Sequence, residues 1–222
     1  MKQKLVIKNI VAFLLFFVLY HNLVYFLLIP EIYTEFIIVF YLAIYYTFNF
    51  VDMFLRPSAK SEFPDIYDLV MGLVFLTGPF SFVLCYLENK YLIQVYFAYL
   101  NNPNISYLGL LLFVISCFII AIGRIQLGRF ASGNLIIQEN HKLITIGIYG
   151  VIRNPIYFGS LLGVIGFALI LRSYFVVSIL FILYFLVFNY RIKREEKLLL
   201  DEFGKDFEEY MSKTKKIIPY LY

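Results

Sequence analysis

The segment Gly147–Gly159, GIYGVIRNPIYFG, places groups that can bind a polar ligand inside a largely apolar part of the chain. It holds a cation, Arg153, an amide, Asn154, and two tyrosines. Pro155 restrains the residue before it from helical geometry and fits the first turn of a helix. The free N–H groups and the positive dipole end of that turn favour an anionic or carboxylate-bearing group. The segment therefore predicts a binding site at a helix entrance.

A second polar group follows the last apolar run, where Arg191 and Glu195 are four positions apart. A helix places such residues on one face. Each of these residues also has a simpler interpretation when it is considered alone. Arg191 and Glu195 would form a surface ion pair worth a few tenths of a kcal/mol. Arg153 would be a snorkelling anchor, and the two tyrosines would belong to the aromatic belt of the membrane interface. Together they indicate a site, because one membrane boundary collects them all. The residues gathered there are Gln138, His141, Tyr149, Arg153, Asn154, Tyr157, Arg191, Glu195 and Glu196.

The elements that must position these residues are membrane helices. Of the 222 residues, 62% are hydrophobic and 15% are charged, which excludes an ordinary soluble domain. About 20 apolar residues in a helix cross the hydrocarbon core, and the period-2 alternation of a barrel strand is absent. The sequence predicts an all-α integral membrane protein with about six transmembrane helices. The expected spans are Ile10–Ile29, Phe36–Leu55, Ile66–Leu87, Tyr107–Gly123, Pro155–Leu171 and Tyr174–Tyr190.

The basic residues predict the orientation of these spans. With a cytoplasmic N-terminus, all but Lys90 and Arg172 of the 19 basic residues lie on the cytoplasmic side. We therefore expect both termini and the polar site at the cytoplasmic face of a cell membrane or endomembrane. In the tail Arg191–Tyr222, an apolar stripe predicts a cytoplasmic amphipathic C-terminal helix that lies in the membrane interface. Cys85 and Cys117 fall inside apolar runs and are expected to be packing residues.

The chain resembles the isoprenylcysteine carboxyl methyltransferase family, to which phospholipid methyltransferases are related, in HKLITIGIYGVIRNPIYFG and in RIKREEKLLLDEFGKDFEEYMSKTKKIIP. The family pattern is His-x-Leu-Val, Gly-x-Tyr and Arg-His-Pro-x-Tyr, followed by a Glu-Glu pair before Phe-Gly-x-x-Tyr. The resemblance runs from about Gly123 to Pro219 and leaves the first three helices outside. It divides one structural domain into an N-terminal three-helix membrane region, residues 1–106, and a methyltransferase-like catalytic membrane region, residues 107–222.

The resemblance implies that S-adenosyl-L-methionine is held at the membrane boundary rather than by a soluble nucleotide-binding domain. It implies a catalytic set of Arg191, Glu195 and Glu196, with Arg191 on the methyl-accepting substrate. Asn154 stands where the eukaryotic enzymes have histidine, and Gly150 replaces a larger residue. The implied cofactor contacts are Gln138, His141, Leu143, Ile144, Tyr149, Asn154, Pro155, Ile156, Tyr157 and Glu195.

An acceptor carboxylate is already ionised near pH 7, so positioning and electrostatics would supply most of the acceleration. The leading hypothesis, which the resemblance implies, is carboxyl O-methylation of an isoprenylcysteine-type acceptor, a lipid-like or prenylated small molecule that enters from the bilayer. The alternatives are a phospholipid N-methyltransferase, an enzyme like the NADPH-dependent membrane sterol reductases, and a non-catalytic membrane protein. Membrane lipid is an expected partner, whereas nucleic acid and metal ions are not expected.

Overall fold

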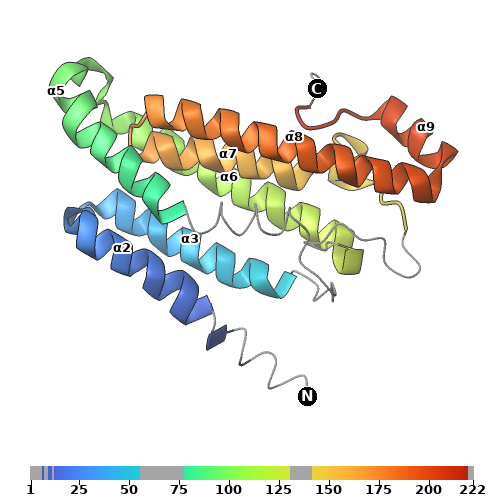
Figure 1. The fold of residues 1–222 in the computed structure, drawn as a ribbon, viewed down its shortest axis with the longest axis horizontal. Helices are drawn as coiled ribbons and strands as arrows, with labels where there is room; N and C mark the ends of the chain where they lie inside the picture. Colours follow the sequence, from blue (N-terminus) through green and yellow to red (C-terminus); the bar gives the residue numbers. More distant parts are fainter. Residues whose placement is uncertain (1–6, 8–9, 12, 56–77, 131–141, 220–222) are drawn as a thin grey trace.

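The computed structural model describes residues 7, 10–11, 13–55, 78–130 and 142–219 (Figure 1). In these ranges the chain is built of helices joined by loops, with one isolated β-bridge between Ile152 and Lys215. The N-terminal elements are the π-helical turn Phe13–Leu19, α2 (Tyr20–Leu28), the 3-10 turn Pro30–Thr34, α3 (Phe36–Leu55) and a helix that ends at residue 87. The next group is the π-helical turn Glu88–Ile93, α5 (Gln94–Tyr96), the turn Ala98–Leu100, α6 (Pro103–Leu127) and the turn Gly128–Phe130. The C-terminal group is the turn Gly147–Gly150, α7 (Pro155–Ile170), α8 (Phe175–Phe203) and α9 (Lys205–Lys213).

Three stretches are helical, long enough and apolar enough to cross a membrane: Phe36–Leu55, Pro103–Phe130 and Phe175–Phe203. Two shorter apolar helices, Phe13–Leu28 and Pro155–Ile170, accompany them. Large apolar side chains are exposed on Phe13–Leu28 and on the three long helices, as suits contact with lipid. The prediction of an all-α integral membrane protein is thus confirmed. The predicted count of six spans includes a segment whose residues 66–77 lie outside the described part of the chain.

Two helices are longer than the membrane spans predicted within them. The span predicted over Tyr107–Gly123 is the longer helix α6, which begins after the N-cap Asn102 and ends at Gly128, where φ is +55°. The span predicted to end at Tyr190 continues as α8 to Phe203, and Gly204 with φ +51° ends it. The charged residues after Tyr190 are good helix formers, so the helix outlasts the apolar run. This continuation gives Arg191 and Glu195 the geometry of one helical turn.

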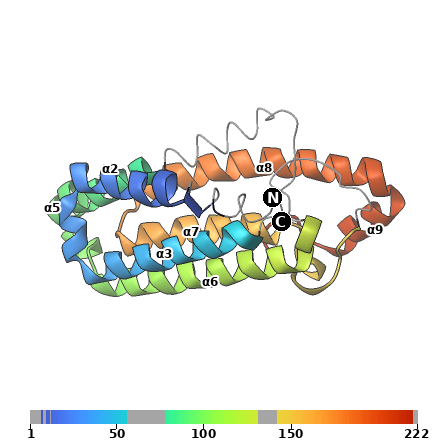
Figure 2. The same ribbon diagram turned by 90° about the horizontal axis from the view of Figure 1, so that it is seen from below.

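Helices α6 and α7 lie side by side along the molecule in both views (Figures 1 and 2). A Cβ atom added to Gly109 would lie only 2.5 Å from the backbone nitrogen of Ile170, and one added to Gly166 would lie 2.8 Å from that of Phe113. Only residues without a side chain allow two backbones to approach so closely in a membrane. The close contact fixes the position of α7, which carries part of the candidate site.

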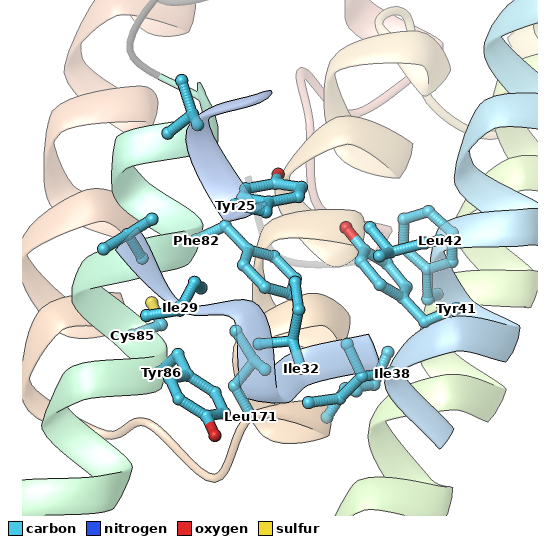
Figure 3. Packing of buried hydrophobic residues seen from close by; sticks show 14 residues of the cluster. Tyr25, Ile29, Ile32, Ile38, Tyr41, Leu42, Phe82, Cys85, Tyr86 and Leu171 are labelled. Atoms are coloured by element: carbon cyan, nitrogen blue, oxygen red, sulfur yellow. The ribbon is translucent and has the colours of Figure 1, made fainter. Parts of the chain in front are cut away.

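The larger apolar core joins the N-terminal helices to α6 and to the end of α7 (Figure 3). The ring centroid of Tyr41 lies 4.7 Å from that of Phe113 on α6. Leu171, just after α7, is buried in the same cluster. Cys85 is buried there, and both it and Cys117 are free thiols, as expected of packing residues. The N-terminal region therefore packs directly on the helices that follow it.

Glu88 caps the beginning of α8 from a distant part of the chain. Its Oε1 accepts hydrogen bonds from the backbone N–H groups of Tyr174 and Phe175, at 2.7 and 2.9 Å. Its Oε2 accepts from Ser173 Oγ at 2.6 Å and from Val176 N at 2.7 Å. A carboxylate in this position satisfies free N–H groups at the positive end of the helix dipole. One side chain of the N-terminal region thus anchors the longest helix of the C-terminal region.

The variant Glu88→Gln is expected to lose roughly 1–3 kcal/mol of stability at pH 7, because an amide oxygen replaces a charged, multiply bonded acceptor. Burial by itself raises the pKa of Glu88, but the hydrogen bonds from Ser173 and from three backbone N–H groups lower it below its usual value. The stabilising contribution is therefore present above the unfolded pKa of about 4.5 and is lost as pH falls through the lower folded pKa.

Thermal melts of the detergent-solubilised protein between pH 7 and pH 3 test this expectation. The wild type should lose stability on acidification more steeply than Glu88→Gln. The matched control is Glu31→Gln, which removes an exposed carboxylate that pairs with Lys90. It should behave like the wild type, because exposed pairs contribute little. Equal melting temperatures of wild type and Glu88→Gln at pH 7 would contradict the capping role.

Candidate functional site

Tyr157, Arg191 and Glu195 meet at the centre of the candidate site. Tyr157 Oη donates a hydrogen bond of 2.6 Å to Glu195 Oε1. Arg191 Nε donates to the same oxygen at 3.1 Å and forms an ion pair with it. Tyr157 lies in the first turn of α7, whereas the other two residues lie one turn apart on α8. The entrance of α7 and the base of α8 are therefore joined through one carboxylate oxygen.

The surroundings of this centre are poor in water. Arg191 is only 7% exposed, and the side chain of Glu195 is 29% exposed. The ring of Tyr157 packs against Phe188 with a centroid distance of 5.1 Å, and Leu161 and Ile192 are buried in the same apolar cluster. Buried charges must be paired, as these are, and their interactions are stronger than in water. A charged ligand that reaches this centre would therefore interact with it strongly.

The loop before α7 folds against α6 and α9. Tyr149 is 5% exposed and donates from Oη to the carbonyl oxygen of Gly123 at 3.3 Å. Its own carbonyl accepts a hydrogen bond of 2.8 Å from Tyr210 Oη. Burial raises the pKa of Tyr149, so its hydroxyl stays neutral. Tyr149 thus supports the loop through contacts with Gly123 and Tyr210.

Asn154 and Pro155 begin α7, but the side chain of Asn154 is engaged elsewhere. Its Nδ2 donates a hydrogen bond of 2.9 Å to the carbonyl of Lys216. Ile156 lies on another face of α7, beside a cavity described below. Leu143 and Ile144 are half-buried in a stretch without regular secondary structure before the loop. Two further predicted contacts, Gln138 and His141, lie outside the described residues.

The chain returns over this site after α9. We call residues 214–217 the C-terminal strap; Lys215 pairs with Ile152 in a parallel bridge, and Arg153 N donates to the carbonyl of Lys215 at 2.8 Å. Ile217 is completely buried in the apolar cluster of Leu161, Phe188 and Ile192. In both views α9 lies at the end of the molecule where α7 begins (Figures 1 and 2). The strap therefore covers the entrance of α7.

Helix α9 is amphipathic, as the sequence predicted, and its apolar side faces the interior of the protein. Phe207 is 1% exposed and Tyr210 is 7% exposed, so both side chains are buried within the protein. Tyr210 Oη donates to the carbonyl oxygen of Tyr149, which joins this side of α9 to the loop before α7. The placement of the helix at the membrane interface stays a prediction. The hydrophobic pattern alone does not distinguish a protein surface from lipid.

Sequence reasoning did not single out the individual contacts of the strap or the partner of Arg153. Arg153 Nε donates to Glu196 Oε1 at 2.9 Å, and Glu196 Oε2 lies 3.8 Å from Lys216 Nζ. The contact spans 43 residues in sequence, so no local periodicity points to it. The only available signal for the strap was the apolar pair Ile217–Ile218 in a charged tail.

A cavity of about 240 Å³ lies between α3, α6, α7 and α8. Ile156 and Ser160 of α7 and Tyr184 of α8 line it, and the ion pair between Asp52 and Arg124 lies at its wall. Ring contacts lead from Tyr184 to Phe188, with 5.7 Å between centroids, and from Phe188 to Tyr157.

In the described part of the chain, no group of three or more His, Cys, Asp and Glu side chains is placed to hold a metal ion.

Comparisons with known proteins agree with this architecture. Residues 104–206 match the family model described as phospholipid methyltransferase. A probable protein-S-isoprenylcysteine O-methyltransferase of Oryza sativa subsp. indica is 30% identical over 119 residues, which cover 53% of this chain and 62% of that protein. The cobalt-zinc-cadmium resistance protein CzcN of Cupriavidus metallidurans is 29% identical over 117 residues, 53% of this chain and 52% of that protein. The chain thus spans less than two thirds of the length of these relatives.

The fold is also similar to a solved structure, that of a eukaryotic intramembrane Ras methyltransferase, isoprenylcysteine carboxyl methyltransferase. The TM-score is 0.59 at 22% sequence identity, and the match covers 68% of this chain and 53% of that chain. The family resemblance predicted from the sequence is confirmed by these findings.

Proposed function

We propose that this chain, which resembles the isoprenylcysteine carboxyl methyltransferase family over its C-terminal half, is a membrane methyltransferase that uses S-adenosyl-L-methionine. Its acceptor is a lipid-like molecule, and the reaction is carboxyl O-methylation of an isoprenylcysteine-type substrate. The observation that carries the proposal is the meeting of Tyr157, Arg191 and Glu195 at one carboxylate oxygen. The proposed catalytic region comprises residues 107–222, with its site and both termini on the cytoplasmic side.

The residues of the site fit the methyl donor, which supplies an electrophilic methyl group on a cationic sulfur. The carboxylate of Glu195 is the complement for a cationic or hydroxyl-bearing part of this cofactor, and the face of the Tyr157 ring suits a cation. The first turn of α7, from Pro155, presents N–H groups to a carboxylate. Leu143, Ile144 and Tyr149 belong to the segment that leads to this turn and complete the proposed cofactor contacts.

Arg191 is proposed to bind the acceptor carboxylate. A planar guanidinium matches a carboxylate in bidentate geometry, and burial excludes competing water. Glu195 holds this guanidinium in place through Nε. Because the acceptor is ionised near neutral pH, the site needs no strong base. Orientation of the two reactants would then supply most of the rate acceleration.

Phospholipid N-methylation is the second candidate, because residues 104–206 match the phospholipid methyltransferase model. An amine acceptor must lose a proton before or during the transfer. The hydrogen-bonded pair of Tyr157 and Glu195 offers a route for that proton, from the amine to Tyr157 Oη as the phenolic proton passes to the carboxylate.

Purified protein in lipid nanodiscs, incubated with radiolabelled methyl donor and either a prenylated cysteine or membrane phospholipid, separates the candidates. We expect label in the prenylated cysteine that mild base releases as methanol, which identifies an ester. Base-stable label in lipid head groups would favour N-methylation. Binding of NADPH in a thermal-shift assay, with no shift by S-adenosylhomocysteine, would overturn the proposal in favour of a reductase.

A further inference from the structure

We propose that Glu196 is a positioning residue that holds the C-terminal strap over the site, and that it touches neither cofactor nor acceptor. It acts through Arg153 and Lys216. This inference rests on the proposed function, because it assigns the strap as the cover of the same site. It also separates the roles of two adjacent carboxylates that the sequence groups as one acidic pair.

The two carboxylates face different partners because successive residues of a helix point about 100° apart. Glu195 Oε1 accepts from Tyr157 and Arg191. Glu196 instead has one oxygen on Arg153 Nε and the other 3.8 Å from Lys216 Nζ. Both oxygens of Glu196 are therefore directed at cations of the segments that surround the site.

Arg153 extends this contact to the end of α9. Its Nη1 donates to the carbonyl of Met211 at 3.0 Å and to that of Thr214 at 2.5 Å. A guanidinium at the end of a helix satisfies free carbonyls and complements the negative dipole end. The side chains of Arg153 and Glu196 are only 13% and 16% exposed, so water and salt screen their attraction weakly. Removing the charge of Glu196 leaves the largely buried Arg153 without this counter-ion.

The strap in turn contacts the residues of the site. The carbonyl of Lys216 accepts from Asn154 Nδ2 at the start of α7. Ile217 is completely buried in the cluster of Phe188 and Ile192, which also contains Tyr157. If the strap leaves, Asn154 loses its partner and the apolar support of Tyr157 opens to water. Glu196 thus controls how tightly the entrance of α7 is closed.

Maleimide labelling of Ile217→Cys measures the strap without any methyl transfer. A water-soluble maleimide should label Ile217→Cys slowly, because the thiol is buried while the strap is closed. Labelling should be at least about tenfold faster once Glu196→Gln is added, because the strap then opens more often. The parent protein, with only Cys85 and Cys117, gives the background. Glu202→Gln, an exposed carboxylate on α8, is the matched control and should leave the rate unchanged. Glu195→Gln should also leave the strap protected.

Arg153→Lys provides a second variant if Glu196→Gln does not fold. It keeps the charge facing Glu196 but loses the fork that reaches Met211 and Thr214, so labelling should rise to an intermediate rate. In kinetic assays, Glu196→Gln should raise KM for the methyl donor about tenfold and change kcat less than about threefold. The double variant Arg153→Gln, Glu196→Gln should have a labelling rate and a KM no higher than those of either single variant.

The proposal is overturned if Ile217→Cys stays protected in both Glu196→Gln and Arg153→Lys. It is equally overturned if Glu196→Gln abolishes kcat while the strap stays closed, because Glu196 would then act at the reacting atoms. Faster labelling without any methyltransferase activity in the wild type would uphold the strap and refute only the proposed function.

Discussion

Glu195→Gln is expected to lower the affinity of the purified protein for S-adenosylhomocysteine by about a hundredfold, or roughly 2.7 kcal/mol. The substitution keeps the shape of the side chain but removes the charge that would complement the ammonium or hydroxyl groups of this ligand and that pairs with the buried Arg191. Loss of one partner of a buried, hydrogen-bonded pair costs several kcal/mol. Isothermal titration in nanodiscs measures the affinity, and thermal melts without ligand show whether the variant is folded.

Tyr157→Phe is the companion variant, because it removes only the hydroxyl that donates to Glu195 and keeps the ring on Phe188. We expect a loss of about tenfold, in line with one hydrogen bond to a charged group. Glu202→Gln serves again as the matched surface control. Wild-type affinity in both Glu195→Gln and Tyr157→Phe would remove the basis for a cofactor site at this place.

Arg191→Lys is expected to reduce kcat/KM for the acceptor about 100- to 1,000-fold while S-adenosylhomocysteine still binds. Lysine retains the positive charge beside Glu195 but cannot present the planar, two-pronged donor that orients a carboxylate. The expected loss corresponds to roughly 3–4 kcal/mol of transition-state stabilisation. Steady-state kinetics with a prenylated cysteine at saturating methyl donor provide the measurement.

Arg194→Lys is the matched control for this prediction, since Arg194 is an exposed cation on the same helix. It should retain the wild-type kcat/KM. If Arg191→Lys also retained it, Arg191 would be a structural partner of Glu195 and the acceptor would have to bind elsewhere. A loss of S-adenosylhomocysteine binding equal to the loss of kcat/KM would place Arg191 on the cofactor instead.

The apolar helices were predictable because hydrophobic length and proline both act locally. The span predicted over Phe36–Leu55 has the bounds of α3, and the span predicted over Pro155–Leu171 differs from α7 only at its last residue. Pro155 marks the start of α7 because it tolerates the first turn of a helix and no interior position. Hydropathy does not mark the end of α8, which continues past Tyr190 although the apolar run ends there.

The centre of the site was accessible to sequence reasoning, whereas the contacts that hold its cover in place were not. Arg191 and Glu195 lie one turn apart, and the family pattern adds Tyr157 from the neighbouring helix. The strap depends on contacts such as Asn154 with Lys216, 62 residues apart in sequence. Contacts of this kind form between backbone carbonyls and side chains, so they leave no periodic pattern in the residue types.

The carboxylate of Glu88, which caps the start of α8, limits how this protein can be shortened or recombined. Glu88 belongs to residues 1–106, yet its four hydrogen bonds hold the residues that open the longest helix of the proposed catalytic region. A shortened enzyme made from residues 107–222 would lack this acceptor and would start that helix frayed. Chimeras with foreign N-terminal helices face the same demand, and must supply an acidic side chain at the far end of the bundle from the site. The N-terminal half is therefore no interchangeable membrane anchor.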